Sequence, residues 1–221
     1  MLKEKLLNLL FPPKCVLCSR VLSDEQTDLC HSCRQDTDEF TKSKKKFSFV
    51  AGWTSLWYYT GNVRHSMLLY KFYRRRSYGP IYGRLLAMKL HAKPLCSYDV
   101  LTWVPVSRFR LMQRGYDQVE LIAHSLGQEL GTPAIPVLTK QRHTKPQSRL
   151  NTPERRRANI LGAFRVNDIT SIQGKTVLLI DDIITTGSTI SECARVLLTA
   201  GAKAVYCAAV AVPHDKKEKR R

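Results

Sequence analysis

Four of the seven cysteines have the spacing of a metal site. Cys15 and Cys18 form one C-x2-C pair, and Cys30 and Cys33 form a second pair after 11 intervening residues. Two such pairs present four thiolates in a tetrahedron, the ligand set typical of structural zinc, although iron satisfies the same spacing. His31 competes as a ligand, but it lies inside the second pair, where we expect its side chain to point away. A segment of roughly 40 residues is too small to fold on apolar burial alone, so the metal is expected to stabilise it.

Two adjacent carboxylates follow an apolar run near the C-terminus. Residues 177–180 (VLLI) are typical of a buried central strand, and Asp181 and Asp182 come next. Open α/β sheets bind ligands at the carboxyl ends of their strands, so we expect both carboxylates in a ligand site. The segment 183–189 (IITTGST) then opens a helical pattern, and its backbone amides, with Gly187 permitting close approach, form a phosphate cradle. This layout suits a phosphorylated sugar with vicinal hydroxyls.

A plain strand–turn–helix connection is the alternative interpretation of this motif. Two adjacent carboxylates are expensive to bury without a partner. A ligand, a metal or a basic side chain is therefore expected beside Asp181 and Asp182 in either case.

The hydrophobic pattern predicts the elements that position these residues. Strand patterns cover residues 100–104, 134–138, 175–180 and 202–212, and residues 47–59 are typical of a strand or a hairpin. Helical patterns cover 80–93, 118–130, 189–200 and the segment that follows 60–62. Strands that alternate with helices predict an α/β fold with a mainly parallel sheet flanked by helices. Residues 139–159 are polar, basic and aperiodic, and we interpret them as a long mobile loop.

Three regions of different composition predict the domain organisation. We expect an N-terminal helix and the four-cysteine zinc ribbon at residues 1–45, the α/β domain at 46–213 and a basic tail at 214–221. Residues 1–10 lack the features of a secretory leader, which indicates a reducing compartment where a pair of disulfides is the weaker alternative to a metal. The leucines of this segment fall on one helical face, which favours a docking helix over a membrane-surface helix. No run approaches 18 apolar residues, so a spanning helix is excluded.

The positive charge is clustered. The chain carries 36 Lys and Arg against 18 Asp and Glu, a formal charge of +18. Most of the excess falls in residues 61–95, 140–160 and 214–221. Such blocks favour a polyanionic partner over a merely solvated surface, because they repel one another when left unpaired. The charge does not distinguish RNA, single-stranded DNA and duplex DNA.

Aromatic residues lie beside one of the basic runs. Tyr70, Phe72 and Tyr73 precede Arg74–Arg76, and they either stack on bases or belong to the core of a helix face. The candidate nucleic-acid contacts are Lys71, Arg74, Arg75, Arg76, Arg114, Lys145, Arg155, Arg156 and Arg157. The isolated Cys193 and Cys207 lie in amphipathic or apolar runs and are predicted to be core residues.

The motifs together resemble a known family. Residues 177–189 (VLLIDDIITTGST) resemble the phosphoribosyl pyrophosphate (PRPP) binding motif of type I phosphoribosyltransferases. With 103–108 (WVPVSR), 114–118 (RGYDQ), 144–147 (TKPQ) and the four cysteines, the chain resembles the ComF family of competence proteins. The resemblance implies a type I phosphoribosyltransferase-like fold with a zinc ribbon.

The resemblance also implies roles for particular residues. Asp181 and Asp182 would be the catalytic residues, and their carboxylates would bind the ribose hydroxyls. The residues implied at the 5′-phosphate are Thr185, Thr186, Gly187, Ser188 and Thr189, and those implied at the pyrophosphate are Val106, Ser107 and Arg108. Mg²⁺ would accompany PRPP, residues 140–159 would close over it, and Arg114 is a further anion contact. The alternative for 114–118 is a helix start, in which Asp117 caps the helix and Arg114 faces solvent.

The implied function is a cytoplasmic role in natural competence. The chain would bind PRPP and single-stranded DNA and assist DNA uptake beside a ComFA-like translocation ATPase. A zinc ribbon occupies the N-terminal place where phosphoribosyltransferases usually recognise the base. This favours a ligand-responsive binding protein over an enzyme with turnover. An active phosphoribosyltransferase on a nucleobase or amine, and a PRPP-sensing regulator that binds nucleic acid, are the alternatives.

Overall fold

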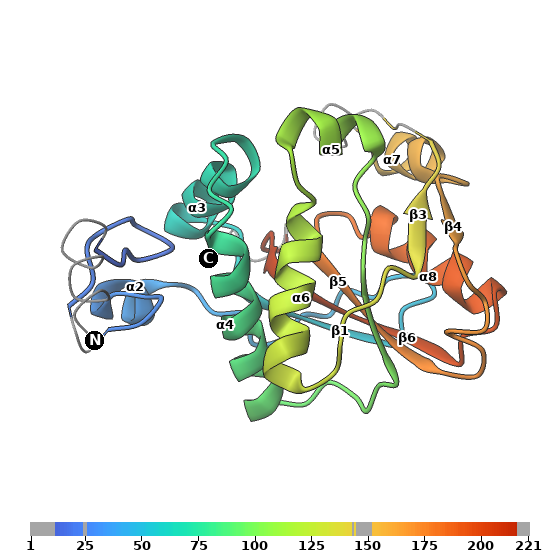
Figure 1. Ribbon diagram of the computed structural model, residues 1–221, viewed down its shortest axis with the longest axis horizontal. Helices are drawn as coiled ribbons and strands as arrows, with labels where there is room; N and C mark the ends of the chain where they lie inside the picture. The colour runs from blue at the N-terminus through green and yellow to red at the C-terminus, as the bar shows by residue number, and fades with distance from the viewer. Residues whose placement is uncertain (1–11, 24–25, 143, 145–151, 216–221) are drawn as a thin grey trace.

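The computed structural model describes residues 12–23, 26–142, 144 and 152–215. Figure 1 shows the order of its elements along the chain. The helices are α2 (His31–Asp36), α3 (Gly61–Phe72), α4 (Tyr78–Ala92), α5 (Arg108–Arg114), α6 (Gln118–Leu130), α7 (Pro153–Ile160) and α8 (Ser188–Thr199). The strands are β1 (Gly52–Tyr58), β2 (Val100–Trp103), β3 (Leu138–Lys140), β4 (Phe164–Val166), β5 (Thr176–Ile183) and β6 (Ala204–Val212).

The central sheet has four strands in the order β1-β6-β5-β2, and every neighbouring pair is parallel. Strands β3 and β4 form a separate antiparallel pair. The predicted α/β fold with a mainly parallel sheet is therefore confirmed, and β5 occupies an interior position.

Each face of the sheet packs against its own helices. Along β5, Leu178 and Ile180 belong to the core that contains α4 and α6, whereas Val177 and Leu179 belong to the core that contains α8. This alternation follows from the two-residue period of a strand. In Figure 1, α4 and α6 run side by side, and α8 lies at the other end of the molecule, in contact with α7 and β4.

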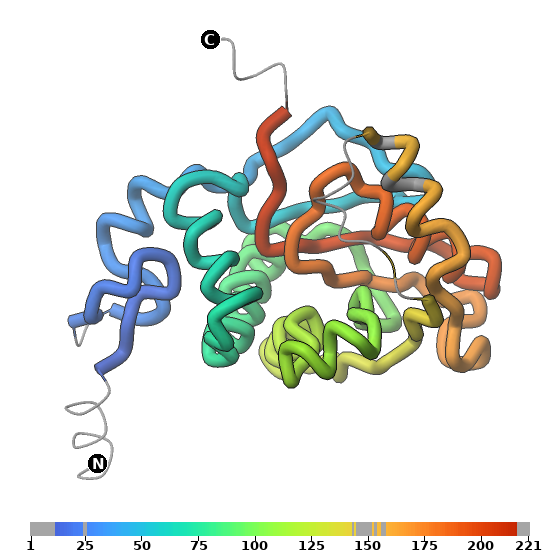
Figure 2. The backbone as a smooth tube through the Cα atoms, turned by 90° about the horizontal axis from the view of Figure 1, so that it is seen from above, coloured from blue at the N-terminus to red at the C-terminus, as the bar shows by residue number. Residues whose placement is uncertain are grey.

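The four-cysteine ribbon is packed against the α/β domain. Val16 and Leu17 are fully buried in one core with Met67 of α3 and Tyr82 of α4. Figures 1 and 2 both place this N-terminal segment at the α3 and α4 end, away from α7 and α8. A contact of Arg84 Nε with Asp28 Oδ2 at 3.3 Å adds a polar link. The ribbon therefore shares its hydrophobic core with the domain that follows it.

The strand predicted at 134–138 is wrong. Only Ala134 forms an isolated bridge, to Leu101, and the strand that follows is β3 at Leu138–Lys140. Pro136 explains the interruption, because proline has no N–H to donate to a ladder.

The long loop predicted at 139–159 is also partly wrong. Strand β3 includes its first two residues, and α7 covers Pro153–Ile160. Proline is favoured at the first helical position, and Thr152 Oγ1 accepts from the backbone N–H of Arg155 at 3.3 Å. Ile160 packs in the core, but α7 is too polar for its period to appear in the sequence. Residues 143 and 145–151, and the N-terminal helix predicted at 1–10, lie outside the described residues.

None of the helices in the described part of the chain has the length and apolar character needed to cross a bilayer.

Candidate functional site

The two carboxylates of the acidic pair lie within β5 rather than beyond its end. Strand β5 continues to Ile183, so Asp181 and Asp182 are consecutive strand residues that point to opposite faces of the sheet. Each is only 9% exposed. Asp182 points toward α3, and Asp181 points toward the α8 face. The pair therefore forms two different environments at one position of the sheet.

Asp182 is paired with a lysine from α3. Lys71 Nζ lies 2.9 Å from Oδ1 and 2.9 Å from Oδ2 of this carboxylate. The Lys71 side chain is 20% exposed and the Asp182 side chain is 12% exposed. The basic partner that a buried carboxylate requires is thus Lys71, a residue that the sequence suggested as a nucleic-acid contact.

Asp181 is buried and forms no ion pair with the described part of the chain. Burial, together with the neighbouring charge of Asp182, raises the pKa of Asp181 to about 8. The backbone N–H of Asp182 donates to Asp181 Oδ1 at 2.8 Å. Lys140, in β3, also lies in this region, and burial with the nearby Arg110 charge lowers its pKa to about 8. Burial therefore favours the protonated form of the Asp181 carboxyl when no ligand is bound.

The connection from β5 to α8 has the compact form predicted for a phosphate cradle. Gly187 has a φ of +76°, which favours glycine, and α8 begins at the next residue. Thr186 Oγ1 and Ser188 Oγ are 3.0 Å apart, while Thr185 is exposed. The ring of Phe47 lies against Gly187. The close approach that the sequence predicted for a phosphate at Gly187 is thus made by an aromatic side chain.

The segment between β2 and α5 is held by hydrogen bonds from both ends. Ser107 caps α5 by accepting from the backbone N–H of Arg110 at 3.4 Å. Asp117 caps α6, since its Oδ1 accepts from Val119 N at 2.9 Å, and its Oδ2 accepts from Val106 N at 2.9 Å. Burial raises the pKa of Asp117 to about 6. The helix-start alternative for residues 114–118 is therefore confirmed for Asp117.

A basic cavity of about 370 Å³ opens beside this segment. Its lining residues come from the start of α5, from β3 and from β4, and they are Ser107, Arg108, Phe109, Thr139, Lys140, Gln141 and Arg165. Three of them are cations. Ser107 and Arg108, implied at a pyrophosphate, thus face the same cavity as Lys140 and Arg165. Residue 140 begins the basic segment that the resemblance implies would close over PRPP, whereas the sequence offered no signal for Arg165.

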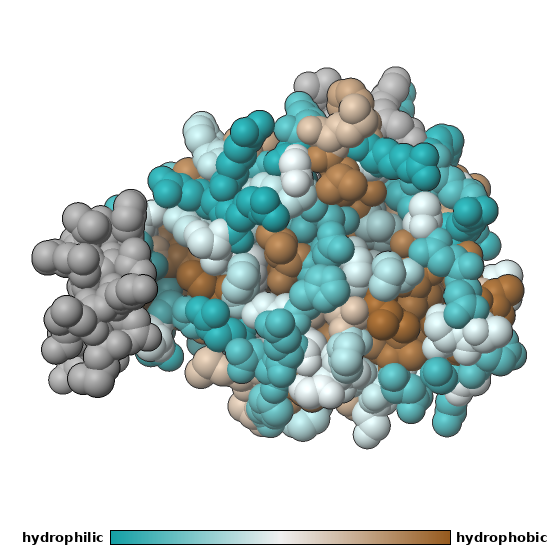
Figure 3. Space-filling view, in the orientation of Figure 1, coloured by the Kyte–Doolittle hydropathy of each residue, from teal (hydrophilic) through white to brown (hydrophobic). Residues whose placement is uncertain are grey.

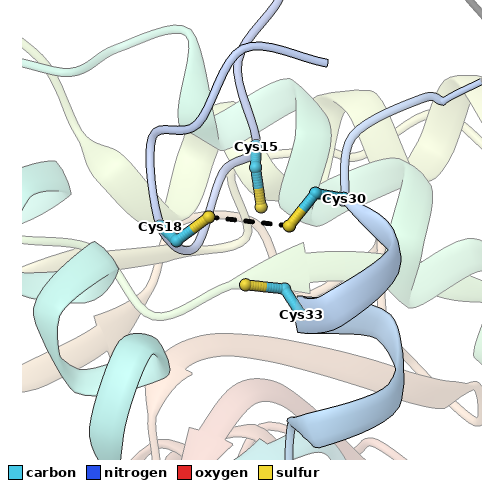
Figure 4. Close-up of side chains that lie close together, drawn as sticks. All are labelled: Cys15, Cys18, Cys30 and Cys33. Atoms are coloured by element: carbon cyan, nitrogen blue, oxygen red, sulfur yellow. Dashed lines mark hydrogen bonds between the residues drawn. The ribbon is translucent and has the colours of Figure 1, made fainter. Parts of the chain in front are cut away.

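The four cysteines of the ribbon point toward one another (Figure 4). All four sulfur atoms lie within 4.8 Å of one another, and the sulfurs of Cys18 and Cys30 are 3.6 Å apart. A tetrahedron with Zn–S bonds of about 2.3 Å has edges of roughly 3.8 Å, so the cluster fits a zinc ion. All the cysteines are free thiols, and His31 is exposed outside the cluster. The four-thiolate assignment is supported over the disulfide alternative.

The main domain contributes a contact to this metal cluster. Asn62 Nδ2, at the start of α3, donates to Cys33 Sγ at 3.8 Å. A hydrogen bond from the Ser32 hydroxyl lowers the pKa of Cys30 to about 6, which favours its thiolate form. Polar groups around metal ligands orient them and tune their affinity. Sequence reasoning missed Asn62, because it lies 29 residues from Cys33.

The aromatic residues at the C-terminal end of α3 were considered for base stacking or for core packing, and they differ in their exposure. Tyr70 is fully buried in the core, whereas Phe72 is 63% exposed and Tyr73 is 70% exposed. The Arg114 guanidinium lies 5.6 Å from the centre of the Phe72 ring, so Arg114 does not merely face solvent. Arg76 lies 5.1 Å from the Tyr116 ring. Core packing is confirmed for Tyr70, and the exposed rings remain candidates for base stacking.

The remaining basic candidates are scattered. Arg74 and Arg75 are exposed beside the α3 end, and Arg155 is exposed on α7. Lys145 lies outside the described residues, as do the side chains of Arg156 and Arg157. Cys193 and Cys207 are fully buried, as predicted for core residues.

Two domain families match the chain in the order that the structure shows. A double zinc ribbon domain matches residues 6–44, and a phosphoribosyl transferase domain matches residues 120–221. A zinc ribbon followed by a type I phosphoribosyltransferase-like α/β domain is therefore the class of this protein.

Curated relatives refine this class. DNA utilization protein YhgH of Escherichia coli (strain K12) is 34% identical over 140 residues, which cover 61% of this chain and 60% of that protein. Competence protein F of Haemophilus influenzae is 34% identical over 104 residues, 46% of this chain and 45% of that protein. A ribose-phosphate pyrophosphokinase of Gloeobacter violaceus is 33% identical over 135 residues, 58% and 39% of the two chains. These similarities support the resemblance of the chain to the ComF family. The chain spans about 60% of the length of the first of these relatives.

Proposed function

We propose that this chain is a cytoplasmic competence protein that binds PRPP and single-stranded DNA and assists DNA uptake beside a translocation ATPase. The observation that carries the proposal is the position of Asp181, Asp182 and the loop to α8 in the centre of a phosphoribosyltransferase-like sheet. The names of the relatives support the DNA-related part of the role.

The PRPP part assigns one chemical task to each segment. The amides and hydroxyls between Thr185 and Thr189 receive the 5′-phosphate, because they open a 12-residue helix whose dipole favours an anion. The two carboxylates accept hydrogen bonds from the ribose hydroxyls. The diphosphate end meets Arg108, Lys140 and Arg165 in the basic cavity. Positioning and charge neutralisation are the contributions expected of such a site.

A magnesium ion suits this donor set. Mg²⁺ prefers carboxylate, phosphate and water oxygens, and one carboxylate of the pair would hold it together with the phosphates of PRPP, since the two side chains point to opposite faces of the sheet. When bound, it would neutralise the charge of the diphosphate. The protein itself orients the sugar and excludes water through the buried surroundings of both carboxylates.

The nucleic-acid part rests on the α3 end. Phe72 and Tyr73 expose aromatic rings beside Arg74, Arg75 and Arg114. In Figure 3, hydrophilic side chains gather over α3, and apolar side chains are visible over α5. Aromatic rings that stack on bases, with cations that contact phosphates, are the recognition mode of sequence-tolerant single-strand binders.

Calorimetry tests the PRPP assignment. PRPP with Mg²⁺ is titrated into the wild type, into the double variant Asp181→Asn/Asp182→Asn and into the control Glu129→Gln, an exposed acid on α6. Hydrogen bonds to charged groups contribute about 1.5–3 kcal/mol each. The double variant should therefore lose at least roughly tenfold in affinity, while the control matches the wild type. Equal affinity in all three proteins would remove the assignment.

Two further measurements separate the remaining roles. Affinity for an oligothymidylate should fall steeply with salt, as counterion release requires, and flat binding would contradict the nucleic-acid role. Release of pyrophosphate with a panel of nucleobases and amines would show a transferase. Selectivity among duplex sequences would show a regulator instead.

A further inference from the structure

The ion pair between Lys71 and Asp182 joins two sites that the proposed function treats separately. Asp182 belongs to the acid pair in β5, and Lys71 is the penultimate residue of α3. The next residues along the chain are Phe72, Tyr73 and Arg74, which begin the exposed aromatic and basic end. The counter-ion of the sugar site is therefore followed directly in the chain by the candidate nucleic-acid surface.

A chain of hydrogen bonds ties the same two regions together. Arg114 Nη1 donates to Gln118 Oε1, and Gln118 Nε2 donates to the backbone oxygen of Lys71 at 3.3 Å. The hydroxyl of Tyr70 donates to the backbone oxygen of Gln118 at 2.6 Å. Tyr116 donates to the backbone oxygen of Tyr70 at 2.8 Å. The last turn of α3 is thus held in place, so the part of Lys71 that is free to respond is its side chain.

A ligand that uses Asp182 must compete with this side chain. Both oxygens of the carboxylate lie 2.9 Å from Lys71 Nζ, so a ribose hydroxyl or a hydrated cation that approaches Asp182 from the side of α3 replaces the ammonium. An ammonium left partly buried without its partner is unfavourable. Its side chain is already 20% exposed and has a route to solvent. The released charge then appears beside Arg74 and Arg75, at the exposed end of α3.

We propose that Lys71 couples the two sites: occupation of Asp182 by the sugar phosphate releases the ammonium, which then serves as an additional phosphate contact for a single-stranded nucleic acid. The inference rests on the proposed function. It adds that the coupling between the two sites is positive, so each ligand strengthens the binding of the other. Linkage requires the effect to be reciprocal, and coupling factors between sites commonly reach 5–150-fold.

The test measures affinity for an oligothymidylate with and without saturating PRPP and Mg²⁺, at matched ionic strength. In the wild type, PRPP should raise the affinity at least about fivefold. It should also steepen the slope of log K against log salt by about 0.7, the value for one added contact on a single strand. In Lys71→Met, both effects should vanish while PRPP still binds. The matched control Arg75→Met should bind the oligonucleotide more weakly but keep the coupling.

A gain-of-affinity variant keeps the test independent of misfolding. Asp182→Asn leaves Lys71 without its counter-ion, so this variant should bind the oligonucleotide without PRPP as tightly as the wild type does with it. The double variant Lys71→Met/Asp182→Asn keeps the net charge of the wild type, and it should lose the gain. An equal gain in the single and double variants would overturn the proposal, because the gain would then not depend on Lys71.

The failures can be told apart. A wild type that binds neither PRPP nor the oligonucleotide contradicts the proposed function itself. A wild type that binds both, with affinities that change less than twofold or that weaken each other, overturns only the coupling through Lys71.

Discussion

Phe47 packs so closely against Gly187 that a Cβ on residue 187 would overlap the Phe47 ring. Phe47 comes from the segment that joins the ribbon to β1, whereas Gly187 stands at the start of α8. The contact therefore connects the beginning of the α/β domain to its phosphate loop. It also explains why glycine is required there for space as well as for its φ of +76°.

We expect Gly187→Ala to destabilise the protein and to weaken PRPP binding. The left-handed backbone alone costs roughly 1–2 kcal/mol for a non-glycine residue, and overpacking against Phe47 adds typically 1–3 kcal/mol. Denaturant unfolding measures the sum. Gly162→Ala is the matched control, since Gly162 has a φ of +68° and open space around its Cα. Equal losses in the two variants would show that the Phe47 contact has no energetic weight.

The ionisation of Asp181 should make stability depend on pH. Burial raises its pKa from 3.8 to about 8 in the folded protein. The proton-linked contribution is fully present below about pH 3.8 and is lost as the pH rises through about 8. The charged groups that act on Asp181 are Asp182, Lys71 and Lys140, and Asp181 in turn raises the pKa of the buried thiols of Cys193 and Cys207.

The variant Asp181→Asn tests this dependence, because the amide has no proton to lose. Between pH 6 and pH 9 the unfolding free energy of the wild type should fall relative to that of the variant, as measured in urea at each pH. Parallel curves for the two proteins would contradict a raised pKa. With PRPP present, the wild type should release a proton on binding if the carboxylate form is the one that accepts the ribose.

Removal of the metal should destabilise helices α3 and α4 as well as the ribbon. Val16 and Leu17 share a core with Met67 and Tyr82, so the loss of the tetrahedral site exposes part of the α3 and α4 surface. Hydrogen exchange after chelation should show faster exchange in both helices as well as in the ribbon. The variant Cys96→Ser, outside the cluster, should retain one zinc per chain. Unchanged protection of α3 and α4 would mean that the shared core is stable without the metal.

Replacement of Asp117 should loosen the segment before α5. Its carboxylate accepts from the backbone N–H groups of Val106, Val119 and Glu120. Loss of a helix cap costs about 0.5–2 kcal/mol, so Asp117→Ala should lower the unfolding free energy by at least that amount. It should also reduce PRPP affinity, since Val106 belongs to the segment that lines the basic cavity. Asp117→Asn keeps one acceptor and should lose less in both measurements.

Local patterns in the sequence were sufficient for the framework of this protein. The spacing of Cys15, Cys18, Cys30 and Cys33 predicted the metal cluster. The alternation of apolar strands and amphipathic helices predicted the parallel sheet, because each element carries its own period. Residues 118–130 form a helix with the predicted bounds, since an acidic cap and a terminal glycine mark its ends in the sequence itself.

Other properties of the site depend on contacts between residues that lie far apart in the chain. Lys71 and Asp182 are 111 residues apart, and Phe47 meets Gly187 only because β1 and β5 are bound through β6. The burial of Tyr70 beside the exposed Phe72 likewise follows from which face of α3 packs on the ribbon and α4. The sequence by itself determined the types of group available for phosphate, sugar and metal. Only the tertiary structure decided which charges are paired and which face solvent, because burial and ion pairing arise when separate elements pack together.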